Sequence, residues 1–166
     1  MIYDVCIEPL PTMALIDIKG KSSDIAPRLL RLGLSEPAPS RALRAATVEV
    51  LRAAREHWLL RAPLEDEDRL LSSLLEDALA PDTLIVPVSD AYAFFGITGP
   101  HARQIMAIAS PLNADPSVFP EDGATFTEAF GQKVLVLRRP DGFQLACERS
   151  YAPMMDDFFL RINGGP

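Results

Sequence analysis

The order of secondary-structure signals repeats once along the chain, and this repeat most constrains what the chain can fold into. The β-favouring segment 13–20 ends in glycine and is followed by a helical pattern at 22–34. The segment 92–99 also ends in glycine, and a second helical pattern starts at Pro100. A hairpin and a further helix follow in both places. The repeat predicts an α+β fold of two interlocked βαββα-type units, with mainly antiparallel sheet and helices packed on it.

The predicted hairpins are apolar runs that flank short polar turns. In the first half the turn is Arg55-Glu56-His57, and in the second it is Pro140-Asp141-Gly142. The second turn has a clear mechanism, because proline presets φ and glycine accepts positive φ. The predicted strands are 47–54 and 58–62 in the first half, and 125–130, 132–139 and 143–150 in the second.

Four amphipathic helices are predicted from apolar residues at helical spacing. Ser22 or Asp24 is the N-cap candidate of the first, Pro100 takes the first helical position of the third, and Ser150 caps the fourth. The closing helices are predicted at 64–79 and 150–162. The expected buried faces are Ile25, Leu29 and Leu32; Leu70, Leu71, Leu74, Leu75, Ala78 and Leu79; Ala102, Ile105, Met106 and Ala109; and Met154, Met155, Phe158, Phe159 and Ile162.

We expect residues 1–166 to form a single domain, because neither half alone would bury both its helices and its sheet. The two pseudo-repeated halves are predicted at about 13–82 and 83–162. The short strand 83–88 opens the second half, and Pro87 marks it as an edge strand or a strand end. Clusters of proline, glycine and polar residues predict loops at 34–43 and 111–123 and a frayed tail at 163–166.

Composition favours a soluble globular protein and excludes several classes. Hydrophobic residues make up 48% of the chain, and the net charge of −7 argues against a nucleic-acid surface. Cys6 and Cys147 form no CxxC pattern, so neither a disulfide framework nor a zinc site is supported, and a cytoplasmic location fits best. We expect no signal peptide and no membrane span.

No catalytic, cofactor or metal motif stands out. His57 lies in a hairpin turn and His101 at a helix start, and neither is surrounded by a motif that would make it a catalytic base. GxGxxG and P-loop patterns do not occur. The acids at 65–68 suit a solvated first turn of a helix better than a metal site, and Cys147 fits a buried small hydrophobe. We therefore predict no catalytic, cofactor-binding or metal-binding residues.

Two short motifs remain as candidates for binding. Trp58 follows Glu56-His57 and has a core or interface role as its default. Arg149, Ser150 and Tyr151 lie at a strand-to-helix junction, where an N-cap with a flanking ion pair is favoured over ligand binding. Gly99-Pro100, which resembles a phosphate-binding turn, is predicted instead to end a strand and start a packed helix.

Four segments in the same order resemble the gamma subunit of heterotetrameric sarcosine oxidase. They are EHWLLRAP (56–63), VPVSDAYAFFGITGPHARQIM (86–106), LNADPSVFPEDGATFTEAF (112–130) and RRPDGFQLACERSYAPMMDDFF (138–159). The likeness begins near Ala14. Two departures occur, because Gly123-Ala124-Thr125 replaces the usual Gly-Cys-Ala and His57 separates Glu56 from Trp58.

The resemblance implies a fold related to the folate-binding region of the glycine cleavage T-protein. It also implies a complex that oxidatively demethylates sarcosine to glycine and hydrogen peroxide and passes the one-carbon unit to tetrahydrofolate. FAD, FMN and NAD belong to the alpha and beta subunits and a zinc site to delta. The gamma subunit carries no such cofactor, so Glu56, Trp58, Arg149, Ser150 and Tyr151 become candidates for partner-interface or family-motif residues.

Alternatives remain open at this point. The chain could be a free-standing module that binds folate, or the equivalent subunit of a complex that demethylates another N-methylated amine. A hydrolase that uses His57 or His101 is the least supported alternative.

Overall fold

The computed structural model describes residues 3–162, which form two compact units, each built on its own five-stranded sheet. The first unit contains residues 12–89, and the second contains residues 90–162 together with the described residues up to Pro11. The predicted tail at 163–166 lies outside the described residues. All strand pairs in both sheets are antiparallel, so the predicted α+β class with antiparallel sheet and packed helices is confirmed.

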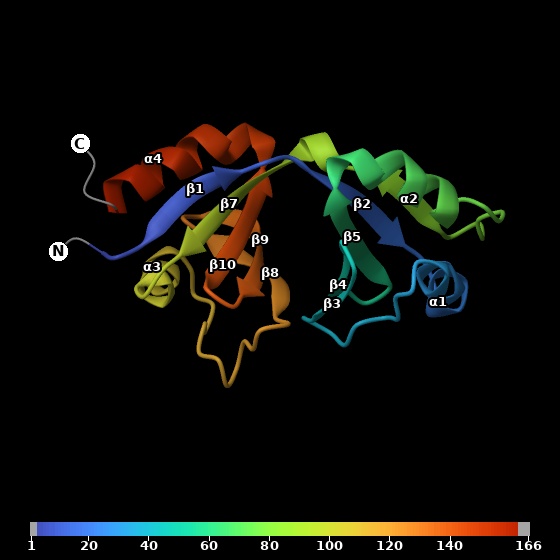
Figure 1. Cartoon of the computed structure of the whole chain (residues 1–166), viewed down its shortest axis with the longest axis horizontal. Coiled ribbons are helices and arrows are strands. Elements are labelled where there is room, and N and C mark those ends of the chain that lie inside the picture. The colour runs from blue at the N-terminus through green and yellow to red at the C-terminus, as the bar shows by residue number, and fades with distance from the viewer. Residues whose placement is uncertain (1–2, 163–166) are drawn as a thin grey trace. The chain divides into compact units, whose positions relative to one another are not determined.

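In the first unit the sheet order is β3-β4-β5-β2-β6, and α1 and α2 pack on it (Figure 1). The elements in chain order are β2 (Met13–Lys19), α1 (Ser22–Arg31), β3 (Ala42–Ala45), β4 (Val48–Ala54), β5 (His57–Pro63), the 3-10 turn η1 (Leu64–Asp66), α2 (Glu67–Leu74) and β6 (Leu84–Pro87). The predicted hairpin is the β4–β5 pair, and β3 was missed because it lies at the end of a proline-rich segment that we predicted as loop.

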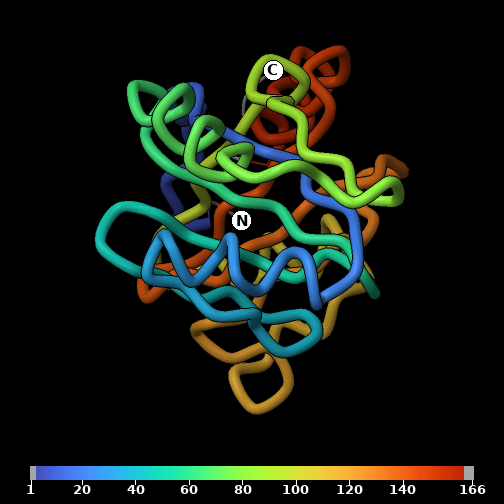
Figure 2. Tube along the Cα trace, turned by 90° about the vertical axis from the view of Figure 1, so that its right-hand side faces the viewer, coloured from blue at the N-terminus to red at the C-terminus, as the bar shows by residue number. Residues whose placement is uncertain are grey.

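The second unit has the same plan, with sheet order β1-β7-β10-β9-β8 (Figure 1). Its elements are β1 (Cys6–Leu10), β7 (Tyr92–Thr98), α3 (Ala102–Ala109), β8 (Ala124–Ala129), β9 (Gln132–Arg139), β10 (Gly142–Glu148), the 3-10 turn η3 (Arg149–Tyr151) and α4 (Ala152–Ile162). The predicted loop between α3 and β8, gold in Figure 2, projects away from the sheet of its unit. Within residues 3–162 no helix is both long and apolar enough to cross a membrane.

The fifth strand of each sheet comes from the segment that directly precedes the first strand of the other unit. β1 pairs with β7 although it runs into β2, and β6 pairs with β2 although the short turn η2 (Ser89–Ala91) leads from it into β7. Segment 83–88 therefore belongs to the first unit and not, as predicted, to the second half. Both fifth strands are edge strands with a proline at the same register position, Pro9 opposite Phe95 and Pro87 opposite Ile16. The expectation of a single domain stays a prediction.

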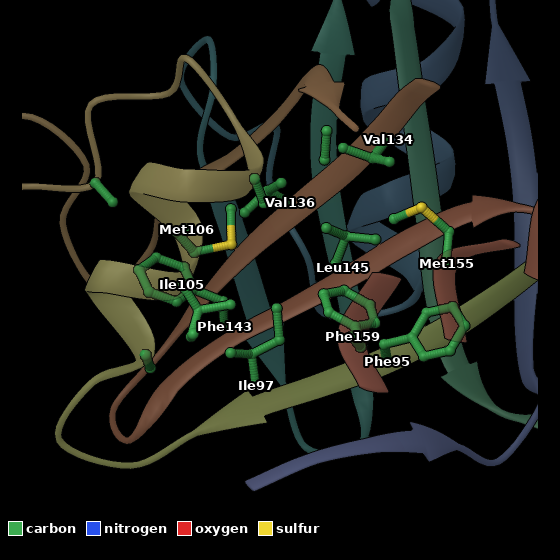
Figure 3. Packing of buried hydrophobic residues seen from close by; sticks show 14 of the residues in the cluster. Phe95, Ile97, Ile105, Met106, Val134, Val136, Phe143, Leu145, Met155 and Phe159 are labelled. Carbon is green, nitrogen blue, oxygen red and sulfur yellow. The ribbon is translucent and has the colours of Figure 1, made fainter. Parts of the chain in front are cut away.

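Each unit has its own apolar core between the sheet and its two helices. In the second unit, Figure 3 shows side chains of α3 and α4 against those of β7, β9 and β10. Phe95 and Phe159 lie with ring centroids 5.4 Å apart. The predicted buried face of α3 is confirmed, and Ile25 and Leu29 of α1 are buried as predicted, whereas Leu32 follows the helix and is only partly buried. The core residues are Phe95, Ile97, Ile105, Met106, Val134, Val136, Phe143, Leu145, Met155 and Phe159 in the second unit, and Ile16, Ile18, Ile25, Leu29, Trp58, Leu60, Leu70 and Leu74 in the first.

The predicted caps of three helices are wrong in detail, although the helices exist. Ser22 lies inside α1, and its hydroxyl donates to the Glu36 carboxylate at 2.5 Å instead of capping the helix. The residue that caps α3 is His101, so Pro100 precedes the helix. Ser150 lies in η3, before α4 begins. Tight backbone turns start these helices, and the capping patterns alone could not show that.

Helix α2 ends at Leu74, five residues before the predicted end, where a buried arginine binds its last carbonyl and two carbonyls of the segment that follows. The Arg28 guanidinium donates to the carbonyl oxygens of Leu74 at 2.7 Å, Asp77 at 3.2 Å and Ala78 at 2.9 Å, and to the Asp24 carboxylate at 3.0 Å. The chain therefore leaves the helical path and wraps around this group. Leu75, Ala78 and Leu79, predicted on the buried face, are exposed.

Replacing Arg28 with methionine tests this arrangement. Arg28→Met fills a similar volume but leaves three carbonyl groups without their donor, so the free energy of unfolding should fall by about 2–4 kcal/mol in urea titrations. Arg31→Met is the matched control, since Arg31 pairs with Asp77 and Glu76 and donates one exposed hydrogen bond of 3.2 Å to the Ser73 carbonyl, so its loss should cost under about 1 kcal/mol. Equal losses in the two variants would contradict the capping role.

Candidate functional site

A histidine and a carboxylate meet at the open end of the β2–β5 pair in the first unit. Asp17 and Lys19 lie two residues apart on β2 and so point to the same face of the sheet, and His57 lies directly opposite Lys19 on β5. The His57 Nε2 atom lies 2.5 Å from Asp17 Oδ1, and the Lys19 Nζ atom lies 3.2 Å from Asp17 Oδ2. Asp17 is thus bound by two basic groups.

The end of β2 and the start of β5 form a corner that is shaped by two turns. Glu56 adopts φ +55° in the hairpin turn between β4 and β5, and its carbonyl accepts a hydrogen bond from the Gly20 N–H at 3.1 Å. A Cβ atom on Gly20 would lie 2.6 Å from Thr83 Oγ1, so glycine at this position leaves room for the Thr83 side chain directly before β6. The end of β2 and the hairpin tip are therefore held side by side.

A cavity of about 410 Å³ opens at this corner. An ion pair between Lys21 Nζ and Asp82 Oδ2, 2.7 Å long, lies along it. Among the residues that line it, cationic side chains outnumber carboxylates. The lining residues are Lys19, Gly20, Lys21, Ala54, Arg55, Glu56, His57 and Asp82.

The pKa of Asp17 is lowered from its ordinary value of 3.8. Burial is the largest influence and raises the pKa, but the hydrogen bond and charge of His57, with a further contribution from Lys19, outweigh it. The carboxylate therefore stays ionised at neutral pH and can orient the His57 ring. Such a pair can hold or transfer a proton at the ring nitrogen, but the lining contributes no serine, threonine or cysteine as a nucleophile. Within residues 3–162 no group of three His, Cys, Asp or Glu side chains is placed to hold a metal ion.

The second unit repeats the corner without these charges. The Gly99 N–H donates to the Asp141 carbonyl at 3.1 Å, as Gly20 does to Glu56. Arg138 stacks on Phe143 at 4.7 Å from the ring centroid, as Arg52 does on Trp58 at 5.7 Å. The register makes Gly96 and Gly142 the equivalents of Asp17 and His57, and a Cβ atom on Gly142 would lie 2.0 Å from the Ile97 carbonyl oxygen. The corner belongs to the shared fold, whereas the histidine–aspartate pair occurs in one repeat only.

The predicted residues Glu56 and Trp58 both lie at this corner but differ in exposure. Glu56 is exposed at the hairpin tip, whereas Trp58 is 0% exposed and packs in the core under α1 and α2. The buried indole N–H of Trp58 has no hydrogen-bond partner among the described residues. Trp58 therefore fills the core, as Phe143 does in the second unit, and its own side chain is not presented as a contact surface.

Arg149, Ser150 and Tyr151 form η3 in the second unit, and Arg149 anchors the start of β7. The Arg149 guanidinium donates to the carbonyl of Asp90 at 2.6 Å and to that of Tyr92 at 2.8 Å. On the first unit's side of the same connector, the buried Ser89 hydroxyl accepts a hydrogen bond from the Leu15 N–H at 2.8 Å and also contacts the Glu67 carboxylate. Ser89 of the V-S-D-x-Y motif and Arg149 of the R-S-Y motif thus fix the segment from β6 to β7 by hydrogen bonds. Ser150 and Tyr151 are exposed.

The other candidate groups have structural surroundings. His101 accepts a hydrogen bond from the Asp4 N–H at its Nδ1 atom, 2.7 Å away. Burial raises the pKa of the Cys147 thiol to about 11, which agrees with an unreactive core residue. Asp66 in the acidic run pairs with Arg69 at 2.9 Å. Gly99 takes φ +113° beside the backbone of Asp4, so its role in the turn is steric. The Asp17–His57 pair was missed because only the register of the β2–β5 pairing, between strands far apart in the sequence, brings the two side chains together.

Solved structures of other proteins share this fold. A chain of the heterotetrameric sarcosine oxidase from Corynebacterium sp. U-96, in complex with pyrrole 2-carboxylate, matches with a TM-score of 0.86 and 16% identity, over 96% of this chain and 84% of that chain. Glycine cleavage system aminomethyltransferase T from Bartonella henselae matches with a TM-score of 0.70 and 16% identity, over 96% of this chain and 46% of that one. No family model and no curated protein sequence matches.

These likenesses confirm the predicted fold: the chain has the architecture of a sarcosine oxidase chain and of part of an aminomethyltransferase. The resemblance that the motifs indicated therefore extends to the fold, over 96% of this chain. At 16% identity the likeness establishes the fold, and the activity has to be argued separately.

The Asp17–His57 pair should make stability depend on pH on the acid side. Because the folded-state pKa of Asp17 lies below its ordinary value of 3.8, its contribution is present above that pH and is lost as the pH falls through the folded pKa. In urea titrations from pH 6 to pH 2.5, Asp17→Asn should lose this part of the wild-type acid sensitivity. His57→Phe should do the same in part, since it removes the main stabilising partner. Unchanged pH profiles in both variants would contradict the assignment.

Proposed function

We propose that this chain is the gamma subunit of a heterotetrameric sarcosine oxidase and acts as a non-catalytic partner of the cofactor-bearing subunits. The observation that carries the proposal is the extent of the match. The shared fold spans 84% of a chain from that complex but only 46% of the aminomethyltransferase chain. A chain that corresponds to most of one subunit, and to half of a longer enzyme, fits a subunit role better than independent catalysis.

In this proposal the complex oxidatively demethylates sarcosine to glycine and transfers the one-carbon unit to tetrahydrofolate in the cytoplasm. FAD, FMN, NAD and tetrahydrofolate are bound by the partner subunits, and alpha, beta and delta are the partners. The family motifs support a scaffolding role, because Ser89 and Arg149 fix the connector and Gly99 permits a close backbone approach. Glu56, Ser150 and Tyr151 are exposed and available for partner contacts.

Large apolar side chains are exposed on both units, and a partner that covered them would gain free energy from their burial. In the first unit Leu30 is 65% exposed, and in the second Leu160 is 63% exposed. The other large apolar residues at the described surface are Leu43, Leu64, Leu75, Leu79, Leu84, Ile108, Val118 and Tyr151.

Co-expression with the alpha, beta and delta subunits tests the proposal. A tagged wild-type chain should elute with all three in one complex of defined mass, and that complex should oxidise sarcosine, whereas the isolated chain should not. Elution of the tagged chain alone, from cells in which every partner is soluble, would exclude the subunit role.

Titration with tetrahydrofolate separates this proposal from a free-standing folate-binding module. The isolated chain should give no saturable heat of binding in calorimetry, since the folate site is assigned to a partner. Saturable binding to the isolated chain would favour the module. A panel of N-methylated amines given to the assembled complex distinguishes sarcosine oxidase from a related demethylase, which would turn over another amine faster.

A further inference from the structure

A small apolar pocket lies between β1 and α4 in the second unit. It has a volume of about 150 Å³, which is room for one medium-sized side chain. Phe95 and Phe159, which are nearly fully buried and lie side by side in Figure 3, contribute its apolar floor. Its other lining residues are Ile7, Glu8, Pro9, Asp156 and Leu160.

The first unit shows what the fold places at this point. Trp58 and Phe143 are equivalent, because they lie at the same register position and each has an arginine stacked on its ring. The same difference in residue number relates the residues of the helices that follow. It pairs Leu70 with Met155 and Leu74 with Phe159, and all four side chains are buried core residues. Helices α2 and α4 thus present corresponding positions to their sheets.

The correspondence breaks at one position. Leu71 of α2 packs against the core of the first unit, but its equivalent in α4 is Asp156, which lines the pocket. The edge strands differ in the same way. Ile85 of β6 is 6% exposed, whereas its equivalent in β1, Ile7, is only partly buried. The first unit therefore has a leucine packed against its core at the position where the second has Asp156 beside a pocket.

The charge around the pocket is acidic. Asp156 and Glu8 lie beside the apolar floor, and no basic residue lines it. Leu160, 63% exposed, adds apolar surface at the rim. A group that enters this pocket gains contact with Phe95 and Phe159 and meets negative charge at the entrance.

We propose that this pocket receives an aliphatic or aromatic side chain of a partner subunit, next to a lysine or arginine that pairs with Asp156 and Glu8. The inference rests on the proposed function, because it names the surface through which that assembly forms. Small apolar pockets that take one anchoring side chain often carry much of the binding energy of an interface.

Asp156→Leu tests the pocket with two measurements, the stability of the chain and its affinity for the partner, which should change in opposite directions. If leucine fills it as Leu71 does in the first unit, the Tm of the isolated chain should rise by about 2–4 °C. The same change closes the pocket and removes its charge, so affinity for the partner complex should fall about tenfold or more in a pull-down titration. Asp156→Asn keeps the shape, and should weaken binding less and reduce its salt dependence.

Asp157→Leu is the matched control, since Asp157 lies on the same helix, pairs with Arg161 and does not line the pocket. It should leave partner affinity within about twofold of wild type. Wild-type assembly with unchanged affinity in Asp156→Leu would overturn the pocket proposal alone. Failure of the wild-type chain to assemble would remove both proposals. A dimer of the isolated chain that Asp156→Leu abolishes would assign the pocket to a second copy and overturn the partner-subunit assignment.

Discussion

The pairing of β1 with β7 and of β6 with β2 is the constraint on which the rest of the structure depends. Each of these outer strands is followed almost at once by the first strand of the other unit, across Pro11-Thr12 in one case and 88–91 in the other. Cutting the chain between the two repeats, on either side of β6, would leave at least one sheet without its outer strand. The pairing is also long-range in sequence, since Ile7 lies opposite Ile97, so it forms only after a large loop has closed.

This crossing explains why the motif residues occur where they do. At the second connector the Val88 N–H donates to the Leu15 carbonyl at 2.7 Å, and the Ser89 hydroxyl satisfies the Leu15 N–H. On the other side Arg149 holds two carbonyls at the start of β7. A segment that leaves one sheet and enters the next lies outside the regular strand pairing, so single backbone bonds and side chains satisfy its polar groups. Family resemblance in such a segment therefore indicates a shared fold before it indicates a shared reaction.

The sequence predicted the elements well where local chemistry decides them. Hydrophobic periodicity located α1 and α3 with their buried residues, and the two hairpins follow from turn residues such as Gly142. It failed where distant contacts decide. Nothing local to 74–79 shows that Arg28, 46 residues before Leu74, would end α2. The Asp17–His57 contact depends on strand register, and strand β1 depends on a partner strand far along the chain. The long-range pairing that assigns β6 to the first unit is likewise not local information.

The duplication separates what the fold requires from what one repeat adds. Leu135 and Ala146 lie opposite each other across β9 and β10, and the equivalent pair in the first unit is Glu49 and Arg61, a buried ion pair 3.2 Å long. Apolar residues occupy the same two positions in the other repeat, so the fold does not require this ion pair. Burying a charge costs free energy unless a partner of opposite charge lies beside it. The same comparison singles out Asp17 with His57, and Asp156. Where one repeat carries a charge and the other an uncharged residue, the fold does not require the charge. Its presence therefore needs an explanation other than folding. The partner contact proposed above would supply that explanation for Asp156, whereas Asp17 and His57 have the glycines Gly96 and Gly142 as their equivalents in the second unit.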